Sequence, residues 1–159
     1  MSFPMAIKPL IRFFKPEDAE HCSFLMQNHF RNYATNLSVE VRRQIADSRT
    51  TEYIQKIVTD RAIVVAVIDH KIVGMGGLKQ NEIRHMYVSS EFQGKGVGSA
   101  ILRFLEKEAY YNGFSSLIVN SVPHSEEFYK KNGFKPLINT QIERHGAKLD
   151  TILLEKLIE

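Results

Sequence analysis

The most informative stretch of the chain is residues 82–99, which read Glu-Ile-Arg-His-Met-Tyr-Val-Ser-Ser-Glu-Phe-Gln-Gly-Lys-Gly-Val-Gly-Ser. Its first part predicts a strand ending at Val88, and after a short polar loop three alternating glycines open an amphipathic helix. Glycine lets the backbone take positive φ and approach a ligand closely. Unpaired amides at a helix start, reinforced by the helix dipole, bind phosphate oxygens. The stretch therefore predicts a strand–loop–helix unit that binds an anion.

Two common anion-binding loops fit this stretch poorly. A Walker loop requires Ser or Thr after its lysine, but Lys95 is followed by Gly96. A dinucleotide fingerprint requires Gly-x-Gly-x-x-Gly, whereas Gly98 comes one position too early. That fingerprint also expects a following strand that ends in an acid, and the strand predicted over 116–120 ends in Asn-Ser.

The rest of the chain predicts a mixed α/β sheet covered by helices, because strands and helices do not alternate regularly. Residues 36–60 suggest one or two short helices with a polar break around residues 47–49. Gly74, Gly76 and Gly77 predict a bulge or a close approach within their strand. The expected strands are 10–14, 62–68, 71–78, 82–88, 116–120, 134–138 and 149–154, and the other expected helices begin at Pro16 or span 97–112 and 125–132.

Composition indicates one folded domain over residues 1–159. With 43% hydrophobic residues the chain can form a core, and its 21 basic residues are interleaved with 18 acidic ones, which argues against a nucleic-acid partner. Cys22 is the only cysteine, so no intramolecular disulfide forms, and its apolar surroundings predict a buried thiol. The lack of a leader-like start and of a long apolar run predicts a cytoplasmic protein that does not enter a membrane.

The loop from Gln93 to Gly98 resembles the Gln/Arg-x-x-Gly-x-Gly/Ala loop of the Gcn5-related N-acetyltransferase (GNAT) superfamily. Four other segments are similar to the same family: Ile11-Arg12 with Pro16-Glu17-Asp18-Ala19, Ile72-Val73-Gly74 with Gly76-Gly77-Leu78, Met86-Tyr87-Val88, and Phe128-Tyr129-Lys130-Lys131-Asn132-Gly133-Phe134. The resemblance implies a GNAT-like acyl-CoA acyltransferase fold. Its central, mostly antiparallel sheet is flanked by helices and splayed between the strands at 82–88 and 116–120.

The resemblance also implies an N-acetyltransferase that uses acetyl-CoA as its acetyl donor. By this resemblance, the main chain of Met86 and Val88 would pair with the pantetheine arm of acetyl-CoA, and the amides of the glycine loop would hold its pyrophosphate. Many members carry an asparagine, seven residues before the position of Tyr129, that bonds the cofactor's arm. In this chain Val122 occupies that position, and Asn120 either contacts the arm instead or caps a turn. The implied cofactor-binding residues are Met86, Tyr87, Val88, Gln93, Gly94, Lys95, Gly96, Val97, Gly98, Ser99 and Asn120.

Two residues are the catalytic candidates. Glu82 matches the position of a base glutamate in some members of the family and would accept the amine proton directly or through water; in a regularly alternating strand it would share a face with Arg84, Met86 and Val88. Tyr129 matches a family tyrosine that protonates the departing thiolate. His85 is expected on the opposite strand face, and no metal site is expected.

The acceptor is expected to be an amine on a small molecule or a protein, and the sequence does not choose among polyamines, amino acids, antibiotics and protein amines. The segments at 33–53 and 139–148 are expected to line its site. The rival interpretation is a non-catalytic acyl-CoA sensor, and a nucleotide-binding protein is the weaker alternative. The protein is expected to be a monomer or a homodimer, with the exposed final strands as one plausible contact.

Overall fold

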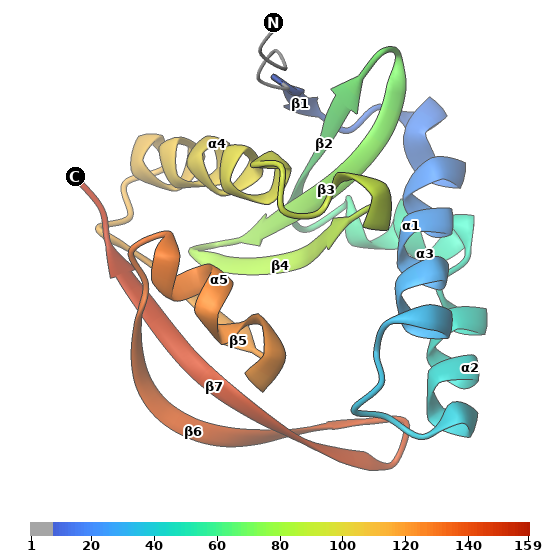
Figure 1. Ribbon diagram of the computed structural model, residues 1–159. Coiled ribbons are helices and arrows are strands. Elements are labelled where there is room, and N and C mark those ends of the chain that lie inside the picture. The colour runs from blue at the N-terminus through green and yellow to red at the C-terminus, as the bar shows by residue number, and fades with distance from the viewer. Residues whose placement is uncertain (1–7) are drawn as a thin grey trace, which may run out of the picture.

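A computed structural model describes residues 8–159. Figure 1 shows one sheet with helices on both of its faces. The strands are β1 (Leu10–Phe13), β2 (Ala62–Ile68), β3 (Lys71–Lys79), β4 (Glu82–Val88), β5 (Ser116–Ser121), β6 (Lys135–Arg144) and β7 (Ala147–Leu157). The helices are α1 (Ala19–Asn32), α2 (Val39–Ser48), α3 (Thr51–Ile57), α4 (Val97–Tyr111) and α5 (Glu126–Lys131). No helix among residues 8–159 is both long and apolar enough to span a bilayer.

The sheet has seven strands in the order β1-β2-β3-β4-β5-β7-β6. Neighbouring strands run antiparallel except β4 and β5, which are parallel and share one residue pair, Glu82 with Ile118. The Ile118 amide donates to the carbonyl of Asn81, and the Asn81 side chain donates to the Ser116 carbonyl. Because the two strands join only at their beginnings, the sheet splays open beyond Glu82, as the family resemblance predicts.

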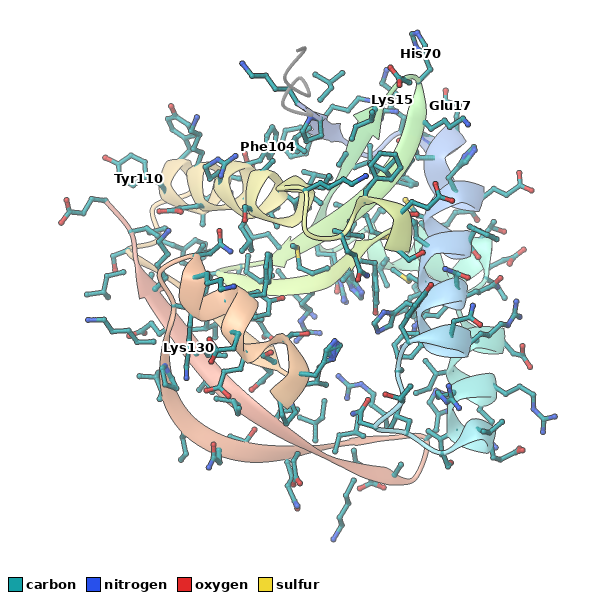
Figure 2. The ribbon with its side chains drawn as sticks, viewed as in Figure 1. Lys15, Glu17, His70, Phe104, Tyr110 and Lys130 are labelled. Atoms are coloured by element: carbon teal, nitrogen blue, oxygen red, sulfur yellow. The ribbon has the colours of Figure 1, made fainter. Side chains whose placement is uncertain are left out.

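The helices pack on both faces of the sheet through apolar side chains. On one face Ile101, Leu105 and other residues of α4 pack with Val64 and Ile83 of the sheet. Phe104 of α4 also lies beside β1, where its ring meets Phe13 edge-on with centroids 5.3 Å apart (Figure 2). The opposite face is covered by α1 and α3 in a separate cluster, and Cys22 of α1 is fully buried there, as its sequence environment predicts.

Strand β4 contains a bulge that reverses its side-chain alternation. Two residues, His85 and Met86, stand opposite Gly76 alone, and His85 takes a positive φ of 58°. Before the bulge Ile83 packs on the α4 face; after it Met86 and Val88 pack on that same face, while Tyr87 faces α1. The expectation that Glu82 and Arg84 share a face with Met86 and Val88 is therefore wrong, since the extra residue shifts the alternation by one.

The chain ends in one long hairpin rather than in two short strands joined by a loop. β6 and β7 pair from Lys135–Glu155 to Arg144–Ala147, and only His145 and Gly146 form the turn. The loop expected at residues 139–148 is thus mostly strand, because cross-strand pairs such as Thr140–Thr151 extend the ladder. The far end of the hairpin lies beside α2 (Figure 1), where Leu149 packs with Leu37 and Ile45.

Candidate active site

The widening gap between β4 and β5 forms a cleft of about 880 Å³. α1, α3, β4, β5, the start of α5 and the β6–β7 hairpin all contribute to its walls. The sequence candidates that line it are Glu82, Met86, Tyr87, Asn120 and Tyr129. Residues 93–99 lie outside the lining, beyond the end of β4, and Val88, the last residue of β4, lies between the two groups.

The glycine loop leaves helix amides uncapped at the end of β4. Gly94 and Gly96 have φ of 73° and 86°, and a Cβ on either would meet no atom within 4 Å. Gly96 is the N-cap of α4 and, as a glycine, has no side chain with which to cap the helix. The first amides of the helix are therefore free to bind an anion. The Gln93 side chain donates to the Val88 carbonyl at 3.2 Å and ties the loop to the strand.

The remaining loop residues have other structural roles. A Cβ on Gly98 would come within 2.9 Å of the Phe128 ring, so this glycine lets α4 and α5 pack closely. The Val97 side chain is buried in the core, so only its main chain can serve a ligand. The Lys95 ammonium lies 5.6 Å from the centre of the Phe92 ring.

Glu82 lies where β4 and β5 separate. Its carboxylate contacts the Arg84 guanidinium at 3.1 Å, and both side chains are partly exposed. The ion pair orients the carboxylate at the narrow end of the cleft.

Tyr129 lies on α5 and is buried, with its ring edge-on to Phe128 and Phe134. Burial raises the pKa of this phenol well above its ordinary value, so the hydroxyl keeps its proton. A buried phenol that borders the cleft can donate a proton there.

His85 lies in the same cleft as Glu82, not on the opposite side of the strand, because the bulge turns it toward α3. Its Nε2 lies 3.0 Å from Nη1 of Arg61. Burial, and then the charges of Arg61, Arg49 and Arg84, lower the pKa of His85 to about 3. The ring therefore stays neutral and accepts a hydrogen bond from Arg61, and Gly77 leaves space beside it.

The cleft also contains arginines that the sequence did not single out. Arg49, Arg61 and Arg144 line it, whereas Arg42, Arg43, Glu143 and His145 from the expected acceptor segments do not. Both expected segments do contribute to the lining, the first through Tyr53 and Arg49 among others and the second through Ile142 and Arg144. These arginines come from separate parts of the chain, so no local sequence signal could group them.

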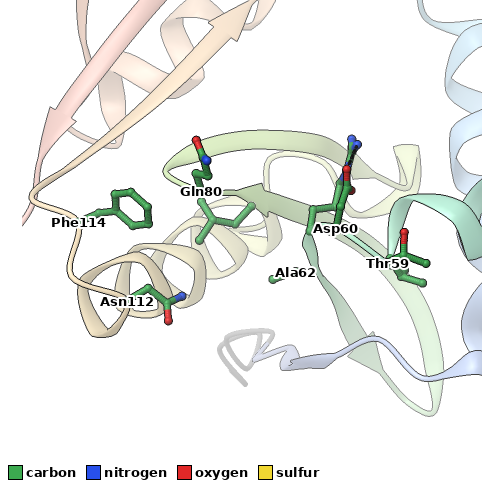
Figure 3. A pocket seen from close by; sticks show the side chains of 9 residues that line it. Thr59, Asp60, Ala62, Gln80, Asn112 and Phe114 are labelled. Atoms are coloured by element: carbon green, nitrogen blue, oxygen red, sulfur yellow. Dashed lines mark hydrogen bonds and ion pairs between the residues drawn. The ribbon is translucent and has the colours of Figure 1, made fainter.

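A second cavity of about 450 Å³ lies between the start of β2, the β3–β4 turn and the end of α4 (Figure 3), and it shares Thr59, Asp60 and Arg61 with the wall of the cleft. Its one carboxylate, Asp60, is paired with Arg61 and Lys79. Among the described residues, this cavity has no glycine loop beside it and no carboxylate comparable to Glu82. Within residues 8–159 no group of three or more His, Cys, Asp or Glu side chains could hold a metal ion.

A splayed sheet with an uncapped glycine loop beside the gap is the arrangement of an acyltransferase of the GNAT type. The family model for the acetyltransferase (GNAT) domain matches residues 30–151. The chain belongs to this family.

Solved structures agree with this fold. A GCN5-related N-acetyltransferase from Rhodopseudomonas palustris is 22% identical with a TM-score of 0.86, covering 98% of this chain and 100% of that one. The PaiA N-acetyltransferase from Thermoplasma acidophilum, solved with coenzyme A, is 22% identical with a TM-score of 0.77, covering 95% and 99%. A putative acetyltransferase, YncA from Salmonella typhimurium, solved with acetyl-CoA, is 17% identical with a TM-score of 0.72, covering 96% and 95%. No curated protein matches the sequence.

Proposed function

We propose that this chain is a single N-acetyltransferase domain that transfers the acetyl group of acetyl-CoA to a primary amine by direct attack. The observation that carries the proposal is the divergence of β4 from β5 after one residue pair, beside a helix start with no side-chain cap. Two structural neighbours were solved with coenzyme A or acetyl-CoA, which supports the same donor here.

The residues around the gap fit such a donor. The edge of β4 beyond Glu82 has no partner strand in β5, so the main chain at Met86 and the amide of Val88 are available to an amide-bearing arm, whereas the Val88 carbonyl already accepts from Gln93. The open space above Gly94 and Gly96 suits a pyrophosphate on the amides that lead into α4. Asn120, exposed at the end of β5, would contact the arm from the other side. When bound, acetyl-CoA supplies an activated acetyl group.

Glu82 and Tyr129 would handle the protons. The amine nitrogen bonds to the acetyl carbon as the bond from that carbon to sulfur breaks. Glu82, directly or through water, accepts the proton that leaves the nitrogen, and Tyr129 donates a proton to the sulfur. The phenol stays protonated, as a donor must, and burial also makes it a weaker acid than an exposed tyrosine. Holding both reactants in the cleft would supply much of the rate acceleration.

The test is calorimetric titration of the protein with acetyl-CoA, coenzyme A, NAD and ATP, followed by an assay of thiol release with an amine panel. Binding of both coenzyme A species alone, with amine-dependent thiol release, is the expected result. Binding without turnover for any amine would favour a sensor, and binding of only ATP or NAD would contradict the proposal. Cytoplasmic location and oligomeric state stay predictions.

A further inference from the structure

The walls of the cleft carry far more positive than negative charge. Two carboxylates, Asp60 and Glu82, line it, and both already contact arginines. The cationic side chains that line it are Arg49, Lys56, Arg61, Arg84 and Arg144. Among residues 8–159, no carboxylate lies within 4.0 Å of Arg49, Lys56 or Arg144. Such a cleft attracts anions and repels polycations.

Arg49 is held in place as an anion-binding group. Its guanidinium lies 4.4 Å from the centre of the Tyr53 ring and 5.6 Å from that of Phe30, and its Nη1 donates to the Ser48 hydroxyl. Its carbonyl accepts hydrogen bonds from side chains of α1, which fixes the backbone between α2 and α3. Its Nε is buried and has no partner in the described chain, as is also true of the Nε atoms of Arg42 and Arg84, so the remaining guanidinium nitrogens are the ones that could meet a ligand. A carboxylate is the partner that a guanidinium fits best.

The phosphates of the donor do not account for these arginines. Their expected site is the loop at 94–99, and none of its residues lines the cleft. The arginines instead surround the part of the cleft bordered by α3, His85 and the tip of the hairpin. Arg49 and Arg144 are close enough to Tyr87 for their charges to affect its pKa. Arg49, Arg61 and Arg84 affect the pKa of His85 in the same way. The acceptor is therefore expected to bind in this part of the cleft.

The hairpin closes the far end of the cleft. Leu149 of β7 packs with Ala34, Leu37 and Ile45, and Ile142 of β6 packs against the same cluster. In Figure 1 the hairpin passes along the base of the molecule toward α2. An extended peptide needs an open groove, so a closed end favours a small acceptor.

We propose that the acceptor is a small amine that also carries a carboxylate, and that Arg49 binds this carboxylate while the amine points toward Glu82. The inference rests on the proposed acetyl transfer and adds the class of acceptor. The surrounding guanidiniums disfavour a positive charge on the bound amine, so the amine loses its proton more readily; burial first, and then the same charges, lower the pKa of His85. Polyamines and aminoglycosides, which lack an anionic group, are poor acceptors.

The test compares amines that differ only in the carboxylate. Protein saturated with coenzyme A, which cannot transfer acetyl, is titrated calorimetrically with the common L-amino acids and the corresponding carboxamides, and with spermidine. The same compounds are then assayed with acetyl-CoA. We expect at least one amino acid to bind and to be acetylated, and its carboxamide and spermidine to do so far less well.

Variants then assign the effect to Arg49. Arg49→Gln lowers kcat/KM for the preferred acid by about 30-fold, as expected for loss of one partner of a desolvated charge pair, and leaves acetyl-CoA binding unchanged. Arg144→Gln removes a second positive charge from the lining of the cleft, and because Arg144 is exposed this variant is less able to disturb folding. Arg43→Gln is the matched control, because Arg43 lies on α2 outside the cleft and pairs with Glu40. Arg43→Gln leaves kcat/KM unchanged.

Three outcomes overturn the inference. The first is equal binding and acetylation of the acids and their carboxamides, including no binding of either, and the second is a preference for spermidine. The third is an unchanged kcat/KM for the acid in both Arg49→Gln and Arg144→Gln. Failure of the proposed function is a separate result, because it would appear as absence of acetyl-CoA binding to the unaltered protein or as absence of thiol release with every amine of the panel.

Discussion

The hydroxyl of Tyr129 is the proposed proton donor to sulfur, and its removal tests that role. Tyr129→Phe keeps the ring packed between Phe128 and Phe134 but deletes the proton. We expect kcat to fall by about 100-fold, the lower range for loss of a general acid, with acetyl-CoA affinity unchanged. Steady-state kinetics and calorimetry measure the two quantities. An unchanged kcat would remove Tyr129 from the mechanism.

His85 makes stability depend on pH. Its pKa is about 3 in the folded protein, against an ordinary value of 6.5, so below about pH 6.5 the unfolded chain binds a proton that the folded chain does not. Stability is therefore lost as the pH falls, by about 2 kcal/mol between pH 7 and pH 5 from this group alone. His85→Asn, which tolerates the positive φ, should show a correspondingly smaller loss in urea unfolding at the two pH values. The same loss in both proteins would show that His85 is already charged in the fold.

The start of α4 is the element expected to hold the pyrophosphate. Gly96→Asp places a negative charge beside that group, and we expect acetyl-CoA affinity to fall by about tenfold or more. Gly113→Asp is the matched control, since Gly113 has a similar φ of 89°, equally open space, and lies beyond the other end of the same helix. Calorimetry should show weaker binding only for Gly96→Asp; equal affinities would contradict the assignment of the loop.

The packing of α4 on β3 depends on the absence of a side chain at Gly76. An added Cβ would lie 2.5 Å from Ile101 and 2.7 Å from Met86. Both neighbours are packed in the core, so Gly76→Ala should destabilise the protein by about 1–3 kcal/mol in urea unfolding. An unchanged midpoint would mean that the helix can move away from the sheet without cost.

The contact between the hairpin and the helices ties together segments far apart in the sequence. Leu149→Ala should lower the free energy of unfolding by about 2 kcal/mol and raise KM for the acceptor, because the closed end of the cleft loosens. Leu137→Ala, on the same hairpin but 55% exposed, should change neither. An unaltered KM in Leu149→Ala would show that the hairpin does not shape the acceptor site.

Local patterns in the sequence were sufficient for most elements of the fold. The β-branched run at 62–68, the glycines before α4 and the apolar face of α4 each specify their own structure, because hydrophobic period and backbone freedom act over a few residues. The splay between β4 and β5 followed from the family resemblance carried by the same loop. Glu82 and Tyr129 were named from that resemblance, and the fold brings both to one cleft.

Only the tertiary structure decided the side-chain directions in β4 and the charge of the cleft. The glycines of β3 predicted a bulge or a close approach in their own strand, but the extra residue lies in β4, at His85, where one glycine of β3 stands opposite two residues. No local pattern in β4 predicts it. The hairpin extends through cross-strand pairs that form only when both strands meet. Arg49, Arg61 and Arg144 are scattered along the sequence and come together because the α2–α3 junction, the segment before β2, and β6 border the same gap. The cofactor loop is local and visible in the sequence, whereas the acceptor site is assembled from distant segments and becomes visible only in the fold.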